Sequence, residues 1–300
     1  QISGSNTYTG NTTILSGTMR LLSNDVLPDG STLVVVGGSL HQGGYADTVH
    51  GVQLIGGGIS HGTLTSVTDF DVRSGAINSV LVGASSSVGL NKTTAGTVWL
   101  YKANTYTGTT TVSLGDLAIA SSERLADGST LVVNGGRFSM VSGVETVAGV
   151  RLTSGSIING TLTSNTDFDL QAGTVSAVLA GASSSVGLRK TTAGSVTLSG
   201  ANTYTGNTVV TAGTLALGAS HVLSNSSALS VNGASAVFDL GSFSDAVSGV
   251  SIGSNGGSIT SSTGTLTGSS YTFSPGSGNT VSVTATWPGH VESLAFYRLY

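Results

Sequence analysis

Short segments of this chain alternate between apolar and polar residues, and the alternation survives when the segments recur. Two positions stay apolar in three copies of one segment: Leu33 and Val35, then Leu131 and Val133, then Leu229 and Val231. The position between them changes from Val34 to Val132 and then to Ser230. A period of two, with one side constant and the other variable, predicts β-strands with one buried face.

The recurrence has a fixed interval that runs through the chain. Asn6-Thr7-Tyr8-Thr9-Gly10 returns at residues 104–108 and again at 202–206, so the copies are 98 residues apart. We therefore divide the chain into repeats at 6–103, 104–201 and 202–300. The third copy keeps the beginning but drifts, and residues 246–250 are displaced by two positions.

The spacing of the strands within one repeat selects the fold. Apolar runs are separated by Gly, Asn, Asp and Ser at intervals of about ten residues, so each repeat must contain several solenoid turns. A β-sandwich would also bury one face of each strand, but gap-free copying favours repeats that stack on one another. We predict an all-β protein: a right-handed parallel β-helix forming a single elongated domain over residues 1–300.

The amino-acid composition agrees with an all-β fold and limits the kinds of partner that the protein can bind. The 300 residues include 45 Gly, 3 Pro and no Cys, and 8% are charged, which leaves little material for long helices and none for disulfides or thiolate sites. With 38% hydrophobic residues the chain should still bury a core. The net charge of −4 argues against nucleic acid as a partner. We see no transmembrane segment, and Gln1 suggests a chain whose leader was removed, or a fragment.

One motif resembles a known repeat. Residues 200–215, Gly-Ala-Asn-Thr-Tyr-Thr-Gly-Asn-Thr-Val-Val-Thr-Ala-Gly-Thr-Leu, return in related form at Asn104–Leu117 and Asn6–Leu21. They resemble the autotransporter-associated β-strand repeat of large bacterial surface proteins, although they cover only some 15 to 20 residues of each copy. The resemblance implies a β-helical passenger, located outside the bacterial cell or on its surface, and brings no catalytic residues.

Two carboxylate pairs are the strongest candidates for chemistry. Asp69 and Asp71 flank Phe70, and Asp167 and Asp169 flank Phe168. On a strand both carboxylates of a pair share one face, as glycosidases and Ca²⁺ sites require. We favour a solvated outer face with Phe in the core, because an active site has no need to be copied in consecutive repeats.

The other candidates are weaker. His41, His50 and His61 fall in one copy without acidic or thiolate companions, so we read them as outward side chains and predict no metal and no cofactor. Ser85-Ser86-Ser87 lacks the context of a catalytic nucleophile and reads as a turn. Tyr8, Tyr106 and Tyr204 could form an exposed row for carbohydrate, but we favour half-buried rings that anchor the start of a turn.

These observations predict a non-enzymatic, structural protein of the bacterial exterior. Our first hypothesis is a subunit of a surface fibre that assembles head to tail with itself. The alternative is an autotransporter-type adhesin passenger that binds glycans or a host surface. A β-helical polysaccharide lyase or hydrolase is the third hypothesis and the least favoured, because acids, Arg and Lys are scarce.

The assembly hypothesis rests on the two ends of the chain. The first residues begin in the middle of a repeat strand, and residues 291–300 supply an apolar strand that could be a cap or an assembly segment. The predicted assembly residues are Gln1, Ile2, Trp287, Leu294, Phe296, Tyr297, Leu299 and Tyr300.

Overall fold

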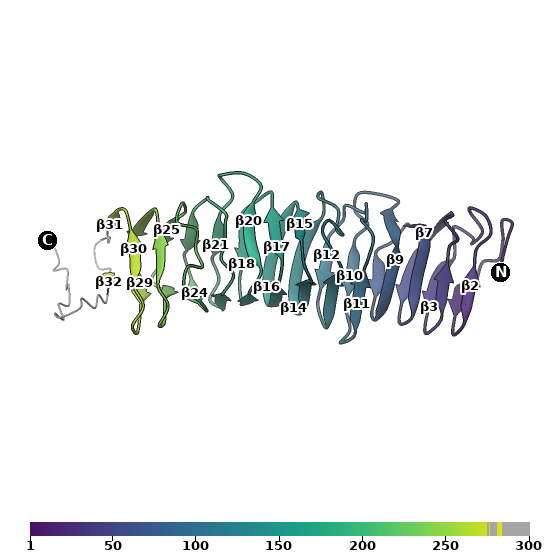
Figure 1. Ribbon diagram of the computed structural model, residues 1–300, viewed down its shortest axis with the longest axis horizontal. Helices are drawn as coiled ribbons and strands as arrows, with labels where there is room; N and C mark the ends of the chain where they lie inside the picture. Colours follow the sequence, from purple (N-terminus) through teal and green to yellow (C-terminus); the bar gives the residue numbers. More distant parts are fainter. Residues whose placement is uncertain (275, 277–280, 284–300) are drawn as a thin grey trace. The chain divides into compact units, whose positions relative to one another are not determined.

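The computed structural model describes residues 1–274, 276 and 281–283, which form β-strands, turns and loops (Figure 1). They divide into two compact units. The first unit contains Gln1–Gly149 and Gly155–Leu162, and the second contains Val150–Ser154 and the residues from Thr163 onward. The prediction of a single domain over residues 1–300 stays a prediction. Among the described residues there is no helix long and apolar enough to span a bilayer.

The strands are short, and all of those in the first unit belong to the first repeat and the first half of the second. Their bounds are β1 Thr12–Ile14, β2 Thr18–Arg20, β3 Thr32–Val35, β4 Ser39–His41, β5 Ala46–Val49, β6 Gly51–Leu54, β7 Gly58–Ser66, β8 Phe70–Val72, β9 Gly75–Gly83, β10 Leu90–Lys92, β11 Thr97–Leu100, β12 Thr110–Val112, β13 Asp116–Ile119, β14 Thr130–Met140 and β15 Val144–Val147.

Two strands, β16 Gly149–Ile158 and β17 Thr161–Ser164, contribute residues to both units. The remaining strands lie in the second unit. Their bounds are β18 Phe168–Leu170, β19 Gly173–Val175, β20 Val178–Gly181, β21 Leu188–Lys190, β22 Ser195–Leu198, β23 Thr208–Val210, β24 Gly213–Leu217, β25 Ala228–Val231, β26 Ala236–Asp239, β27 Asp245–Val247, β28 Gly249–Ile252, β29 Gly257–Thr260, β30 Leu266–Gly268, β31 Tyr271–Phe273 and β32 Val281–Val283.

The strands β1 to β14 of the first unit pair in parallel with strands one turn away, so they form columns. One column runs β1, β3, β6, β8, β10, β12 and β14. A second runs β2, β4, β7, β9, β11, β13 and the later part of β14. A shorter third column joins β5 to the later parts of β7 and β9. This is the predicted parallel β-solenoid.

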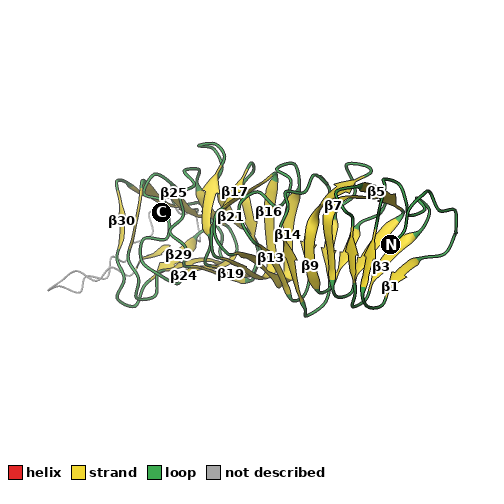
Figure 2. Ribbon diagram, turned by 45° about the vertical axis from the view of Figure 1, so that its right-hand side comes forward, coloured by secondary structure: helices red, strands yellow, loops and turns green. Residues whose placement is uncertain are grey.

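The second unit repeats the arrangement (Figure 2). Its first column contains part of β16, then β18, β21, β23, β25, β28 and β31. Its second column contains β19, β22, β24, β26, β29 and β32, and β27 pairs with β30 in a third. All of these pairs are parallel, as in the first unit.

The side chains predicted to point inward form the core. Phe168 is completely buried and Val150 is 3% exposed, and the strands around them alternate between buried and partly exposed positions. The buried predicted residues are Leu131, Val133, Val150, Leu152, Leu162 and Phe168. The prediction drawn from alternation within the repeats is confirmed.

The pairing also explains the length of the repeat. Starting at Thr12, successive partners are Leu33, Val52, Phe70, Leu90 and Thr110, and Thr110 is 98 residues after Thr12. One repeat is thus five turns of 18 to 21 residues. In the third copy Leu229 pairs with Val250, which makes that turn two residues longer than the turn from Leu33 to Val52. The displacement seen in the sequence is a longer loop.

Candidate functional site

The structure describes only part of the predicted assembly set. Ile2 forms an isolated parallel bridge to Leu21, and Gln1 and Ile2 border a hollow of about 560 Å³ that Ile14 and Met19 also line. Trp287, Leu294, Phe296, Tyr297, Leu299 and Tyr300 lie outside the described residues. Head-to-tail assembly therefore stays a prediction.

The Asp-Phe-Asp segments have the predicted orientation, with Phe buried and the aspartates facing outward. The aspartate side chains are not fully solvated, however, because they are hydrogen-bonded to neighbouring residues. Phe168 is buried, whereas the Asp167 and Asp169 side chains are 30% and 31% exposed. Asp167 accepts hydrogen bonds from the Gly187 backbone N–H at 2.8 Å and from the Arg189 Nε at 2.6 Å, one turn away. Asp169 pairs with Arg151 at 2.9 Å.

The first copy uses its acids in the same way. Asp69 accepts the Gly89 backbone N–H at 2.8 Å, and Asp71 pairs with Arg73 at 2.8 Å. These carboxylates hold neighbouring turns or residues in place, which accounts for their presence in two repeats. Within the described part of the chain, His, Cys, Asp and Glu nowhere gather in groups of three or more that could hold a metal ion.

The structure places the candidate histidines and serines at different positions on the surface. His41 and His61 lie on adjacent turns and stack on each other, with ring centroids 4.4 Å apart, whereas His50 is exposed elsewhere. Ser85 and Ser87 lie in an exposed turn, where their hydroxyl groups hydrogen-bond to each other at 2.8 Å. The predicted turn is confirmed for the serines.

The tyrosines of the recurring motif are more buried than predicted. Tyr106 and Tyr204 are fully buried, and only Tyr8 is partly exposed, at 39%. The Tyr106 ring lies 5.9 Å from the Phe70 ring of an earlier turn, and its hydroxyl bonds the Thr110 hydroxyl at 2.9 Å inside the core. Half-burial was therefore wrong for two of the three rings, and these two cannot belong to an exposed carbohydrate-binding row.

The asparagine that begins the motif ties three turns together. Asn104 is 4% exposed, its Oδ1 accepts the Leu81 backbone N–H at 2.8 Å, and its Nδ2 donates to the Arg124 carbonyl at 2.8 Å. Gly108 ends the motif where the chain passes so close that a Cβ would lie 2.4 Å from the Val88 carbonyl oxygen. The Asn, Tyr and Gly of the motif thus make buried contacts, whereas Thr105 and Thr107 between them are exposed.

Three buried carboxylates were missed by the sequence analysis. Asp47, Glu145 and Asp245 occupy equivalent positions in the three repeats and are at most 3% exposed. Each accepts hydrogen bonds from two successive backbone N–H groups of the preceding turn. The donors are Val26 and Leu27 for Asp47, Arg124 and Leu125 for Glu145, and Val222 and Leu223 for Asp245.

Burial dominates the electrostatics of the first two acids. Desolvation raises the pKa of Asp47, and it raises the pKa of Glu145 to about 8, against the opposing effect of the backbone donors. The loop that each acid supports has no third-column strand, so its N–H groups need acceptors from side chains. The carboxylates therefore accept the backbone hydrogen bonds that a neighbouring strand would accept in a sheet.

Two buried lysines were also missed. Lys92 and Lys190 are fully buried on equivalent strands, and burial lowers the pKa of both. The Lys92 Nζ donates to the carbonyls of Thr94 and Leu114, the latter at 2.9 Å, and Lys190 makes the same contacts with Thr192 and Ala212. Each lysine holds one corner of a turn to the next turn.

The signal for these groups was present in the sequence. Asp47 stands two residues before Val49, and Lys92 stands two residues after Leu90, so strand alternation places each charge on the inward side. Both charges recur in the next repeat at the matching position. An inward-facing charge that recurs with the repeat predicts a buried group bonded to the backbone.

The segment that contains Lys92, Asn104 and Tyr106 also matches a known family model. A model described as the passenger-associated-transport-repeat matches residues 1–21, 90–119 and 188–217. The chain carries three passenger-associated-transport-repeats. The three matched segments leave most of the chain uncovered. They confirm the resemblance predicted from the motif. No curated protein and no solved structure matches the chain.

The passenger-associated-transport-repeats correspond to defined parts of the solenoid. The second extends from β10 to β13 and the third from β21 to β24, so each covers two strands of the first column and two of the second. Both contain the buried Lys, Asn and Tyr described above. The matched segments therefore include side chains that connect one turn to the next.

Proposed function

We propose that this chain is a passenger segment of an autotransporter-type protein, a non-catalytic β-solenoid scaffold on the bacterial exterior. The observation that carries the proposal is the presence of three passenger-associated-transport-repeats in a chain whose strands pair in parallel from turn to turn within each unit. In the second of these repeats the buried side chains of Lys92, Asn104 and Tyr106 are hydrogen-bonded to the backbone or to another side chain. The candidate carboxylates Asp69, Asp167 and Asp169 each bond a residue of a neighbouring turn.

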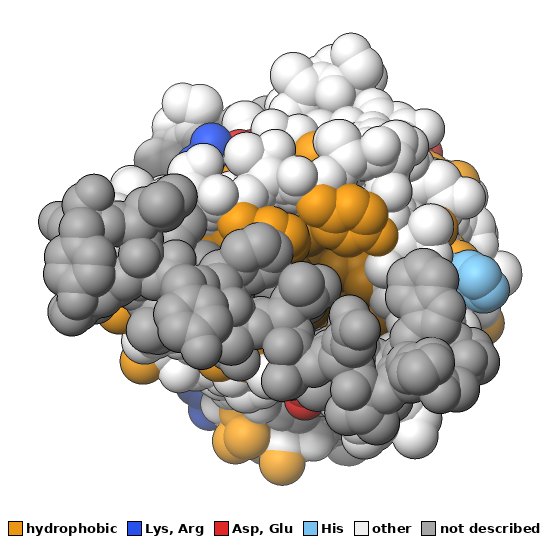
Figure 3. All heavy atoms as spheres, turned by 90° about the vertical axis from the view of Figure 1, so that its left-hand side faces the viewer, with side chains coloured by type: hydrophobic (Ala, Val, Ile, Leu, Met, Phe, Trp, Pro, Cys, Tyr) orange, Lys and Arg blue, Asp and Glu red, His pale blue; other side chains and the backbone are white. Residues whose placement is uncertain are grey.

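The distribution of charge supports a scaffold. Among the described residues visible in Figure 3, few acidic or basic side chains can be seen. Four of the arginines pair with Asp71, Asp116, Asp169 and Asp167. Such pairs neutralise charge at the surface and contribute little to stability individually. This surface is suited to a spacer that presents few reactive groups.

Location on the cell surface is tested by labelling intact cells. Antibodies raised against the purified chain should bind intact cells of the bacterium that encodes it, and permeabilisation should not increase the signal. An antibody to a cytoplasmic protein is the control that confirms intact envelopes. Labelling that appears only after permeabilisation would contradict a surface passenger.

We propose as a second candidate that copies of the chain associate head to tail. The hollow beside Gln1 and Ile2, lined in part by Ile14 and Met19, supports it, because apolar walls of this kind accept a further strand. Sedimentation of the full chain should show concentration-dependent growth of the particles, and removal of residues 294–300 should abolish it. A full chain that stays monomeric at high concentration, or a truncated chain that grows equally, rules out this association.

A further inference from the structure

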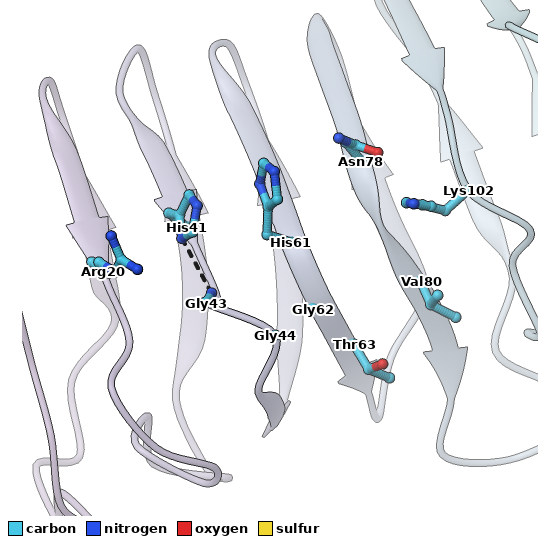
Figure 4. Close-up of a pocket in the computed structure, with 10 residues that line it drawn as sticks. All are labelled: Arg20, His41, Gly43, Gly44, His61, Gly62, Thr63, Asn78, Val80 and Lys102. Atoms are coloured by element: carbon cyan, nitrogen blue, oxygen red, sulfur yellow. Dashed lines mark hydrogen bonds between the residues drawn. The ribbon is translucent and has the colours of Figure 1, made fainter.

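A groove of about 610 Å³ crosses five consecutive turns of the first unit (Figure 4). Arg20 on β2 pairs with His41 on β4, which pairs with Ser60, and Ser60 pairs with Asn78 on β9. Lys102 follows β11 one turn further along. At about 4.8 Å per turn, the row from Arg20 to Lys102 is about 19 Å long.

Two stacked histidine rings, those of His41 and His61, lie in the middle of the groove. The Gly43 backbone N–H donates to the His41 Nδ1 at 3.2 Å, which leaves Nε2–H as the donor of the neutral ring. The His61 ring stacks on the His41 ring with an angle of 16° between the planes. Figure 4 shows both rings projecting from neighbouring strands, with Asn78 on the next strand.

The two cations of the groove are unusual in this chain. Every other described Lys or Arg donates a hydrogen bond to a carboxylate, hydroxyl or carbonyl oxygen. Arg20 and Lys102 have no such partner among the described residues, and both are exposed. The described residues that line the groove include no Asp or Glu. The groove therefore presents two exposed cations that bond no other described side chain or carbonyl, in a protein of net negative charge.

The other repeats show that the fold does not need this row. In the second copy Arg20, His41, His61 and Lys102 are replaced by Ala118, Ser139, Asn159 and Gly200. The pair of Arg20 and His41 corresponds to Ala118 and Ser139 in the same register, and to Ala216 and Asp239 in the third copy. The same turns form with uncharged or acidic residues, so the basic row has another purpose.

Two local features separate the groove from its counterpart. Gly43 and Gly44 line it, both with positive φ, where the second copy has Val141 and Ser142. His61 itself adopts φ 64°, where the second copy places Asn159 at φ 61°. The left-handed conformation is thus kept in both copies, while the side chain that it presents changes from imidazole to amide.

From this arrangement we infer that the groove binds an acidic linear polysaccharide. Arg20 and Lys102 would take carboxylate or sulfate groups of the glycan, and the His41 Nε2–H, the Asn78 amide and the Thr63 hydroxyl would bond its hydroxyl groups. One turn of the solenoid is similar in length to one pyranose ring of an extended chain. Two cations about 19 Å apart suit widely spaced anionic groups better than the dense phosphates of a nucleic acid.

This inference goes beyond the scaffold function and does not depend on it, since binding is measured on the purified chain. The probes are hexagalacturonate, which carries carboxylates, a heparin hexasaccharide, which adds sulfates, and neutral cellohexaose. The variants are R20A/K102Q and H41S/H61N, the latter taken from the second repeat, which folds with those residues. R151Q is the matched control, because Arg151 is also exposed, lies outside the groove and corresponds to Gln53 of the first copy.

We expect the unaltered chain to bind hexagalacturonate or the heparin hexasaccharide at least about tenfold more tightly than cellohexaose. R20A/K102Q should weaken acidic-glycan binding about tenfold or more, H41S/H61N should weaken it without lowering the thermal midpoint, and R151Q should leave it unchanged. The relative affinities of the two acidic probes distinguish carboxylate from sulfate recognition. Equal binding of cellohexaose, equal loss in R151Q, equal or tighter binding of a single-stranded DNA oligonucleotide, or no binding of either acidic probe would overturn the inference.

Discussion

The unfolding free energy of this protein should fall as the pH rises from about 5 to about 9, and Glu145 should be responsible for most of the change. Glu145 is fully buried, and desolvation raises its pKa from 4.5 to about 8. Between these values the folded chain holds a proton that the unfolded chain releases. Stability from this group is complete below the unfolded pKa and is lost as the pH rises through the folded pKa.

The size of the effect follows from the shift. One pKa unit corresponds to about 1.4 kcal/mol, so the rise of the Glu145 pKa from 4.5 to about 8 corresponds to about 5 kcal/mol of stability. The raised pKa of Asp47 adds to the slope with the same sign. Because the repeats are stacked, loss of the loop that Glu145 supports at residues 124–125 should weaken the turns around it.

Denaturant unfolding across the pH range, compared for the unaltered chain and E145Q, measures this effect. E145Q keeps a carbonyl acceptor but cannot ionise, so its unfolding free energy should be lower by about 1 to 2 kcal/mol near pH 5 and should vary much less with pH. E123Q is the control, because Glu123 belongs to the same loop and bonds Thr146. A slope that survives in E145Q, or disappears equally in E123Q, would show that Glu145 does not carry it.

The fold could be predicted because two independent periodicities point to it. Alternation identified the inward side of each strand, as Leu131 and Phe168 show, and the 98-residue interval required equivalent strands to stack. The failure at Tyr106 has a physical reason. A ring with a hydroxyl group was expected at the boundary of the core, but Thr110 supplies a partner inside it.

The buried charges and the groove were harder to predict. Charged residues are rarely buried, and the backbone donors that make Glu145 an exception become visible only when the preceding turn is in place. The histidines were noticed, but their association with Arg20 and Lys102 depends on the register of five turns of unequal length. Sequence spacing alone cannot align side chains whose turns vary by several residues.

The central claim is that each 98-residue repeat consists of five turns, so that one whole repeat can be removed without changing how the remaining strands pair. Removal of residues 104–201 joins Ala103 to Asn202, which has the same role as Asn104, so the turns on both sides should still match. Removal of residues 104–191 joins Ala103 to Thr192. The second-column strand β11 is then followed directly by β22, which also belongs to the second column, so the strands no longer alternate between columns.

The decisive measurement is thermal unfolding of these two deletion variants, followed by circular dichroism. The in-register deletion should keep a β-rich spectrum and a cooperative transition with a midpoint close to that of the full chain, and the out-of-register deletion should lose its cooperative transition. If the in-register deletion fails to fold, or if both deletions fold equally well, the five-turn repeat is not the unit of this structure.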